Sequence, residues 1–181
     1  MTSRTAVVLP GGQNGPAAPL PMFASDAAEH RGASVQPVWW DEPDRPLSLT
    51  EAERGPWVLP QAAKALAAAT GDVLLIGKSL GTHASVLAAE RGLPAVWLTP
   101  VLTSDWVVDG LRRSTAPFLL VGGTADPLWD STLARELTPY VLEVPEADHG
   151  MYVPGRLAES AAVLGQVATA VEDFLDQVVW L

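Results

Sequence analysis

Short apolar runs alternate with amphipathic stretches along almost the whole chain. The apolar runs predict six strands, at Thr5–Leu9, Ser34–Trp40, Asp72–Ile76, Ala95–Leu98, Phe118–Val121 and Tyr140–Val144. The stretches between them, with their turn residues, predict helices at Met22–Arg31, Pro60–Ala69, Leu80–Glu90, Trp106–Arg113, Ser131–Leu137 and Leu157–Val179. The last helix is the most strongly patterned, with one apolar stripe formed by Leu157, Ala161, Leu164, Ala168, Val171, Leu175 and Val178. The proline-rich stretch from Pro43 to Pro60 is expected to be a long connection.

Strands that are apolar throughout and alternate with helices indicate a parallel sheet covered on both faces. We therefore expect an α/β fold with three α/β/α layers and a mostly parallel, doubly wound sheet of six strands. The chain shows no internal repeat, and residues 1–181 are expected to form a single domain. In such sheets the reactive loops gather at the carboxyl ends of the strands.

Composition and charge narrow the functional classes. The formal net charge is −10, and the longest basic cluster is Arg112-Arg113, so we expect binding neither to nucleic acid nor to an acidic membrane surface. The absence of cysteine excludes disulfides, thiolate catalysis and Cys-ligated zinc. The first apolar run is too short for a secretory signal, and none approaches the ~20 residues of a membrane helix. We expect a cytoplasmic monomer or homodimer without metal or cofactor.

The segment Gly77-Lys78-Ser79-Leu80-Gly81 fits the pattern G-x-S-x-G between a buried strand and a helix. That context predicts a nucleophile elbow, in which the serine takes a strained backbone conformation and exposes its hydroxyl. The glycines are expected to relieve crowding across the turn. A helix N-cap serine is the structural alternative, and the bare motif is weak without its context.

A serine hydroxyl needs a base, and the chain has three histidines. His149 follows the sixth strand in a loop and is the predicted base, whereas His30 ends a helix and His83 is expected to be a packing residue. Asp126 follows the fifth strand and is the predicted carboxylate that orients the imidazole. Asp105 and Asp148 are the alternatives for that carboxylate.

The order Ser79, Asp126, His149 is the order of the α/β-hydrolases. With Gly123-Thr124-Ala125-Asp126 and Asp148-His149-Gly150, the chain resembles that superfamily over nearly its whole length, in particular small capless esterases and dienelactone-hydrolase-like proteins. Two departures stand out. The chain begins at the strand that usually comes third, and only about 17 residues separate the fourth and fifth strands, where the family inserts its lid. The resemblance therefore implies an open, shallow site without a lid domain.

The resemblance also implies an oxyanion hole formed by backbone N–H groups. One is that of Leu80, and the other is that of Gly12 or the neighbouring Gln13, in the loop after the first strand. Trp106, Trp129 and Met151 are the candidate substrate contacts. Lys78 is either a surface charge or a group that favours anionic acyl substrates.

These features predict a serine hydrolase that cleaves an ester or related acyl bond of a small substrate through an acyl-Ser79 intermediate, as a carboxylic ester hydrolase does. Two alternatives remain open. The chain could be a non-catalytic binding protein on a hydrolase fold, or it could use the same triad as an acyltransferase or a lyase.

Overall fold

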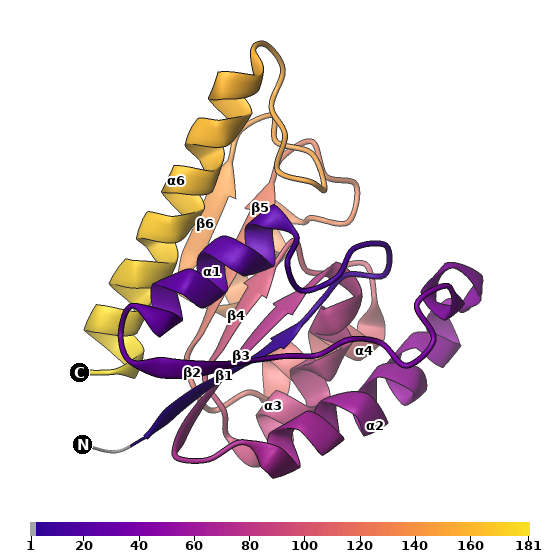
Figure 1. The fold of residues 1–181 in the computed structure, drawn as a ribbon. Helices are drawn as coiled ribbons and strands as arrows, with labels where there is room; N and C mark the ends of the chain where they lie inside the picture. Colours follow the sequence, from indigo (N-terminus) through magenta and orange to yellow (C-terminus); the bar gives the residue numbers. More distant parts are fainter. Residues whose placement is uncertain (1–2) are drawn as a thin grey trace.

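The computed structural model describes residues 3–181, and one parallel sheet lies at its centre (Figure 1). The strands are β1 (Arg4–Leu9), β2 (Ala33–Pro37), β3 (Asp72–Lys78), β4 (Ala95–Leu98), β5 (Phe118–Gly123) and β6 (Val141–Val144). They pair in the order β2-β1-β3-β4-β5-β6, and every pairing among the described residues is parallel. The chain moves from β1 outwards to β2 and then returns past β1 to β3. The sheet is therefore doubly wound, as predicted, and its switch point lies between β1 and β3.

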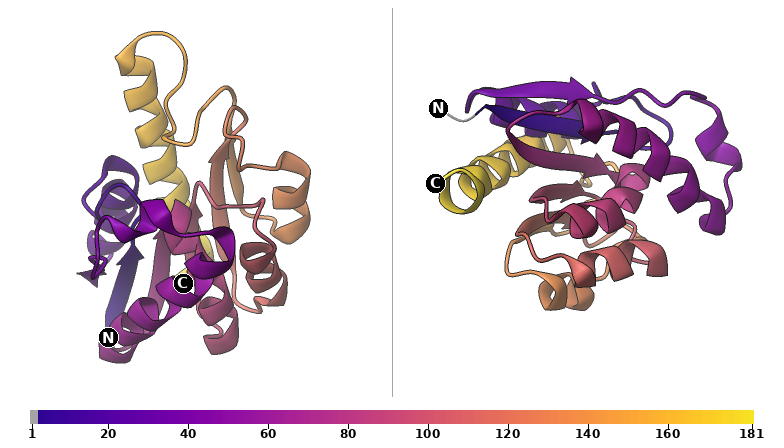
Figure 2. Two further views of the ribbon diagram at one scale, coloured as in Figure 1. Left: turned by 90° about the vertical axis from the view of Figure 1, so that its right-hand side faces the viewer. Right: turned by 90° about the horizontal axis from the view of Figure 1, so that it is seen from below.

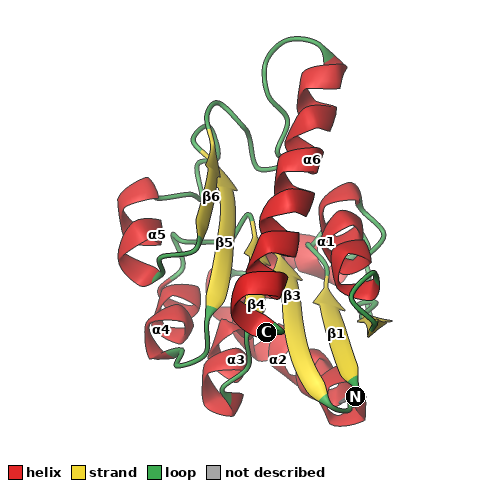
Figure 3. Ribbon diagram, turned by 90° about the vertical axis from the view of Figure 1, so that its left-hand side faces the viewer, coloured by secondary structure: helices red, strands yellow, loops and turns green. Residues whose placement is uncertain are grey.

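Helices cover both faces of the sheet (Figures 2 and 3). They are α1 (Pro19–Glu29), α2 (Glu51–Ala68), α3 (Ser85–Arg91), α4 (Asp105–Arg113), α5 (Ser131–Leu137) and α6 (Leu157–Phe174). Two short 3₁₀ helices, η1 (Arg45–Ser48) and η2 (Ser79–Ala84), precede α2 and α3, and a π-helical turn, η3 (Leu175–Val179), continues α6. This is the three-layer α/β/α architecture that the sequence predicts.

The sheet separates two apolar layers, because successive side chains of a strand point to opposite faces. In β1, Ala6 and Val8 pack with α1 and α6, whereas Val7 and Leu9 pack with the helices of the other face. Arg31, just after α1, pairs with Glu172 of α6 at 3.1 Å and makes a two-pronged contact with the Asp176 carboxylate at 2.6 and 2.7 Å. One face is thus built from elements at opposite ends of the sequence.

The prediction that Pro43 to Pro60 form a long connection is wrong. Most of it is helical, since α2 starts at Glu51 and continues through Pro56 and Pro60. A capping box at Thr50 holds its first turn: the Glu53 carboxylate accepts from the Thr50 backbone N–H at 2.8 Å and from its hydroxyl at 2.7 Å.

The last helix is present, but its apolar stripe does not face the sheet over its full length. The buried positions in the N-terminal half are Ser160, Val163 and Val167, whereas Leu157 of the predicted stripe is 73% exposed. Figure 1 shows why: the first turns of α6 extend beyond the ends of the strands, where there is no sheet to cover them.

Two further predictions concern added segments. Between β4 and β5 the described chain forms the single helix α4, so no lid domain is inserted within residues 3–181, as predicted. None of the helices in that range combines the length and the apolar character needed to cross a bilayer.

Candidate active site

Ser79 follows β3 directly and starts η2, at the switch point of the sheet. Its φ is +49°, a left-handed conformation that is costly for a residue with a Cβ. The two glycines of the motif have different neighbours. A Cβ on Gly77 would lie 2.5 Å from the Trp97 ring and 3.0 Å from the Gly81 carbonyl oxygen, and a Cβ on Gly81 would collide with the Leu9 carbonyl of β1. Gly81 therefore serves packing against β1 rather than relief across the turn.

The structure brings together three side chains that are far apart in sequence. His149 Nε2 lies 2.8 Å from Ser79 Oγ, and His149 Nδ1 lies 2.7 Å from Asp126 Oδ2. Because a carboxylate only accepts, Nδ1 carries the proton, and Nε2 is left to accept from the Ser79 hydroxyl. The Asp126 side chain is fully buried, while a third of the His149 side chain is exposed. The arrangement links a buried carboxylate, through one imidazole, to the hydroxyl of a residue that lines a cavity.

Asp126 is held in place by its own turn. Its second oxygen, Oδ1, accepts the Leu128 backbone N–H at 2.9 Å, and its backbone N–H donates to the Gly123 carbonyl at 3.1 Å. Both contacts fix the carboxylate at the end of β5, where Oδ2 is aimed at His149.

Neither of the two alternative carboxylates, Asp148 and Asp105, accepts a hydrogen bond from the His149 ring. Asp148 Oδ1 accepts the backbone N–H groups of Gly150 and Tyr152, at 2.8 and 2.9 Å, and so shapes the loop that carries His149. Asp105 is exposed in the first turn of α4.

His83 is fully buried, as expected of a packing residue, and its Nδ1 lies 3.0 Å from the Leu80 carbonyl. Its Nε2 lies 3.4 Å from Glu51 Oε1. Burial lowers the pKa of His83 and so favours the neutral form of its ring. His83 lines the same cavity as Ser79, but its two ring nitrogens contact Leu80 and Glu51 and not the Ser79 hydroxyl.

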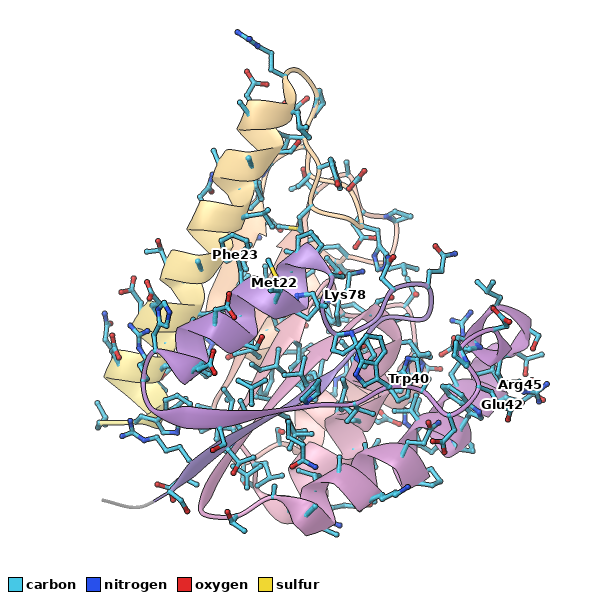
Figure 4. All side chains as sticks on the ribbon, viewed as in Figure 1. Met22, Phe23, Trp40, Glu42, Arg45 and Lys78 are labelled. Carbon is cyan, nitrogen blue, oxygen red and sulfur yellow. The ribbon has the colours of Figure 1, made fainter. Side chains whose placement is uncertain are left out.

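The three residues predicted for the oxyanion hole line the same cavity as Ser79. Gly12 lies against Leu80, since a Cβ on Gly12 would be 3.7 Å from Leu80 Cδ2. Among residues 3–181, no group accepts a hydrogen bond from the backbone N–H of Gly12 or Gln13. The loop is anchored from behind, because Trp40 Nε1 donates to the Gly11 carbonyl at 3.0 Å (Trp40 is labelled in Figure 4).

Trp106 and Trp129 were predicted as substrate contacts. In the structure each indole packs against a glycine and donates a hydrogen bond within the protein. The Trp106 indole covers Gly55 of α2, and its N–H donates to the His83 carbonyl at 3.0 Å. The Trp129 indole covers Gly122, and its N–H donates to Glu143 at 2.7 Å. Neither side chain lines the two cavities described below, so we assign both to packing.

Two adjoining cavities lie at the carboxyl ends of the strands. The reactive cavity, of about 450 Å³, contains Ser79 and His149, and the apolar cavity, of about 600 Å³, lies between the loop after β1, the loop after His149 and the start of α6. Asn14, Lys78 and Gly150 line both. Met151, the third predicted substrate contact, lines the apolar cavity, is 2% exposed and has a φ of +64°.

Several lining residues were not among the sequence predictions. Pro46, Leu47 and Arg54 come from η1 and α2, and they reach the reactive cavity because that segment folds as helix rather than as a loose connection. The capping-box pattern Thr50-x-x-Glu53 was the available signal for that helix. Tyr152, Leu157, Ala161 and Leu164 line the apolar cavity, together with Trp39, whose place at the carboxyl end of a predicted strand already makes it a candidate wall of the site.

Within residues 3–181, no group of three or more His, Asp or Glu side chains is arranged to hold a metal ion.

Comparison with known proteins identifies the fold. No family model and no curated protein sequence matches the chain. Among solved structures, dienelactone hydrolase from Anabaena variabilis is similar at a TM-score of 0.72 and 20% identity, over 98% of this chain and 87% of that one. Est1E from Butyrivibrio proteoclasticus, in a structure with bound ferulic acid, gives 0.70 and 13% identity, over 98% and 89%. A serine hydrolase without a lid from Xanthomonas campestris gives 0.57 and 16%, over 96% and 83%. The chain thus has the α/β-hydrolase fold, in the form without a lid.

Proposed function

We propose that this protein is a serine hydrolase that cleaves an ester or a related acyl bond of a small substrate. The observation that carries the proposal is the continuous chain of contacts from Ser79 Oγ through His149 to Asp126, at 2.8 and 2.7 Å. A hydroxyl becomes a useful nucleophile when a positioned base takes its proton, and a buried carboxylate stabilises the imidazolium that results.

In the proposed reaction, Ser79 Oγ attacks the substrate carbonyl carbon while its proton moves to His149 Nε2. The carbonyl oxygen becomes an oxyanion, which the backbone N–H groups of Leu80 and Gly12 or Gln13 stabilise. Collapse breaks the bond to the leaving alkoxide, which receives the proton from His149 and departs as an alcohol. The acyl group stays on Ser79.

Water completes the cycle. His149 Nε2 takes a proton from a water molecule as its oxygen attacks the acyl carbon, and then returns that proton to Ser79 Oγ. The net change is ester and water to carboxylic acid and alcohol, with the enzyme restored. Asp126 keeps the proton of His149 on Nδ1 throughout.

The experiment is labelling with a fluorophosphonate probe, followed by turnover of short-chain 4-nitrophenyl esters. We expect wild-type protein to be labelled and active, and Ser79→Ala to be unlabelled and several orders of magnitude slower. Ser34→Ala, at an exposed serine on β2, is the matched control and keeps both properties. Equal labelling of Ser79→Ala and wild type, or folded wild type that is neither labelled nor active, would refute the proposal.

The two alternatives gain no support from a particular observation. A binding protein would have no need for the short contact between Ser79 and His149. An acyltransferase would pass the acyl group to an added alcohol or thiol, so product analysis with such acceptors separates transfer from hydrolysis.

A further inference from the structure

The charged side chains that line the two cavities are all positive. Lys78 and Arg54 are the only Asp, Glu, Lys or Arg side chains among the described residues that line them, so no carboxylate is present. The chain as a whole has 21 acidic and 11 basic residues. The charged side chains that line the two cavities are thus both basic, in a protein that is acidic overall.

Lys78 and Arg54 differ in how their charge is balanced. Arg54 is already paired with Glu51 at 2.7 Å. Lys78 makes no ion pair and no side-chain hydrogen bond with any described residue. The nearby carboxylates, Asp126 and Asp148, are committed to His149 and to backbone N–H groups, as described above.

The ammonium group of Lys78 lies close to the proposed reaction centre. The position that a Cβ on Gly11 would take is 3.8 Å from Lys78 Nζ and 3.7 Å from Ser79 Cβ, so both atoms lie within 4 Å of one point. Lys78 also belongs to the lining of both cavities, at their junction. In Figure 4 the Lys78 label stands near the start of α1.

The free charge is costly to keep in this position. Burial is the main influence on Lys78 and lowers the pKa of its ammonium group, although the charges of Asp126 and Asp148 act in the opposite direction. A partly buried lysine whose ammonium group has no hydrogen-bond acceptor in the described chain loses solvation, and the charges of Asp126 and Asp148 offset that loss only in part. A carboxylate placed in the cavity would accept its hydrogen bonds and offset that loss.

We propose, on the basis of the proposed hydrolase function, that the substrate carries a free carboxylate which binds Lys78 Nζ while its scissile carbonyl lies at Ser79 Oγ. The substrate's aliphatic or aromatic part lies in the apolar cavity, against Met151 and Leu164. One ammonium matches one carboxylate. A phosphate dianion would leave excess charge beside apolar walls, so the structure favours half-esters of dicarboxylic acids and related acid esters.

The test compares two substrates that differ in one charge, the mono-4-nitrophenyl ester of adipic acid and its methyl-capped diester. Release of 4-nitrophenolate gives kcat/KM for each, and the readout is their ratio. We expect wild type to prefer the acid, and the ratio to fall about 10- to 100-fold in Lys78→Met, which keeps the aliphatic stem. Lys78→Arg should restore part of the preference. Lys64→Met, at the exposed lysine on α2, is the control and keeps the wild-type ratio.

A binding measurement separates this inference from the proposed reaction. Ser79→Ala protein is titrated with hexanoate and with hexanamide, and the backbone amide signals of Gly11 and Gly150 are followed by NMR. Tighter binding of hexanoate, lost in Ser79→Ala/Lys78→Met, supports the carboxylate site even if no ester is turned over. Equal binding of the two ligands, or a ratio of kcat/KM that Lys78→Met leaves unchanged, would overturn it. Labelling of Ser79 by a neutral fluorophosphonate reports the proposed reaction independently of Lys78.

Discussion

Replacing Ser79 by glycine rather than alanine should give the more stable protein. Both substitutions remove the hydroxyl and its 2.8 Å contact with His149, so that loss is common to them. They differ in the Cβ, which alanine keeps and glycine lacks, at a backbone φ of +49°. The comparison therefore isolates the cost of holding a side chain in the left-handed region.

The magnitude follows from two opposing terms. A left-handed conformation costs a residue with a Cβ roughly 1–2 kcal/mol, and glycine avoids that cost. Glycine in turn loses about 0.5–1 kcal/mol relative to alanine, because its unfolded chain has more conformations to give up. The net expectation is that Ser79→Gly exceeds Ser79→Ala in free energy of unfolding by about 0.5–1 kcal/mol, or roughly 2 °C in Tm for a chain of this length.

Urea denaturation followed by tryptophan fluorescence measures the difference. Ala162→Gly, at an exposed position in the middle of α6, is the control and should lose about 1 kcal/mol, because the helical backbone favours alanine. The sign of the alanine-to-glycine change is thus opposite at the two sites. If Ser79→Ala were as stable as Ser79→Gly or more so, the claim that the turn at Ser79 is strained would be refuted.

Three further predictions concern groups around Ser79. Gly81→Ala should destabilise the protein by about 2–3 kcal/mol in urea denaturation, because the added methyl group meets the Leu9 carbonyl, and full stability would contradict that packing. Trp40→Phe keeps most of the ring but removes the N–H bond to the Gly11 carbonyl, so kcat should fall about tenfold with KM nearly unchanged; a change in KM alone would contradict a role in holding the loop. Lys78→Met should raise Tm near pH 7 by about 2–4 °C. The folded-state pKa of Lys78 is lowered, so the cost of its charge is complete below that pKa and declines to zero as the pH rises from there to the unfolded-state pKa. A gain in Tm that stays constant into alkaline pH would contradict this origin.

The juxtaposition of the three candidate side chains could be predicted from the sequence because the topology of the sheet brings them together. Ser79, Asp126 and His149 each follow the carboxyl end of a parallel strand, and those ends share one edge of the sheet. The G-x-S-x-G spacing singled out Ser79, and the order of strands and helices then placed Asp126 and His149 beside it. The shared edge is a consequence of strand direction, which the alternation of strands and helices already implies.

Local signals failed where tertiary packing outweighed them. Pro56 and Pro60 indicate a break in the chain, yet both lie inside α2, whose face with Val58 and Ala62 is buried against the sheet. Pro56 is the sixth residue of the helix and lies beyond its first turn, so it removes one i→i−4 backbone hydrogen bond. The buried apolar face compensates for that loss.

The apolar cavity could not be predicted from the hydrophobic pattern either. The hydrophobic periodicity of Leu157, Ala161 and Leu164 is that of a stripe that faces a core. That periodicity does not indicate that α6 extends beyond the strands beside it. The wall of a cavity and the wall of a core have the same pattern. Only the length of the opposing sheet distinguishes them.

The pairing of α1 with α6 also determines when the protein can finish folding during synthesis. The face of the sheet that contains Ala6 and Ile76 is covered by α1 and by Val163, Val167 and Phe174 of α6. A ribosome that has translated the first 150 residues has therefore produced a sheet with one face largely bare. That face can close only after α6 has left the exit tunnel. Until then the exposed strands are the part of the nascent chain that a chaperone would need to shield.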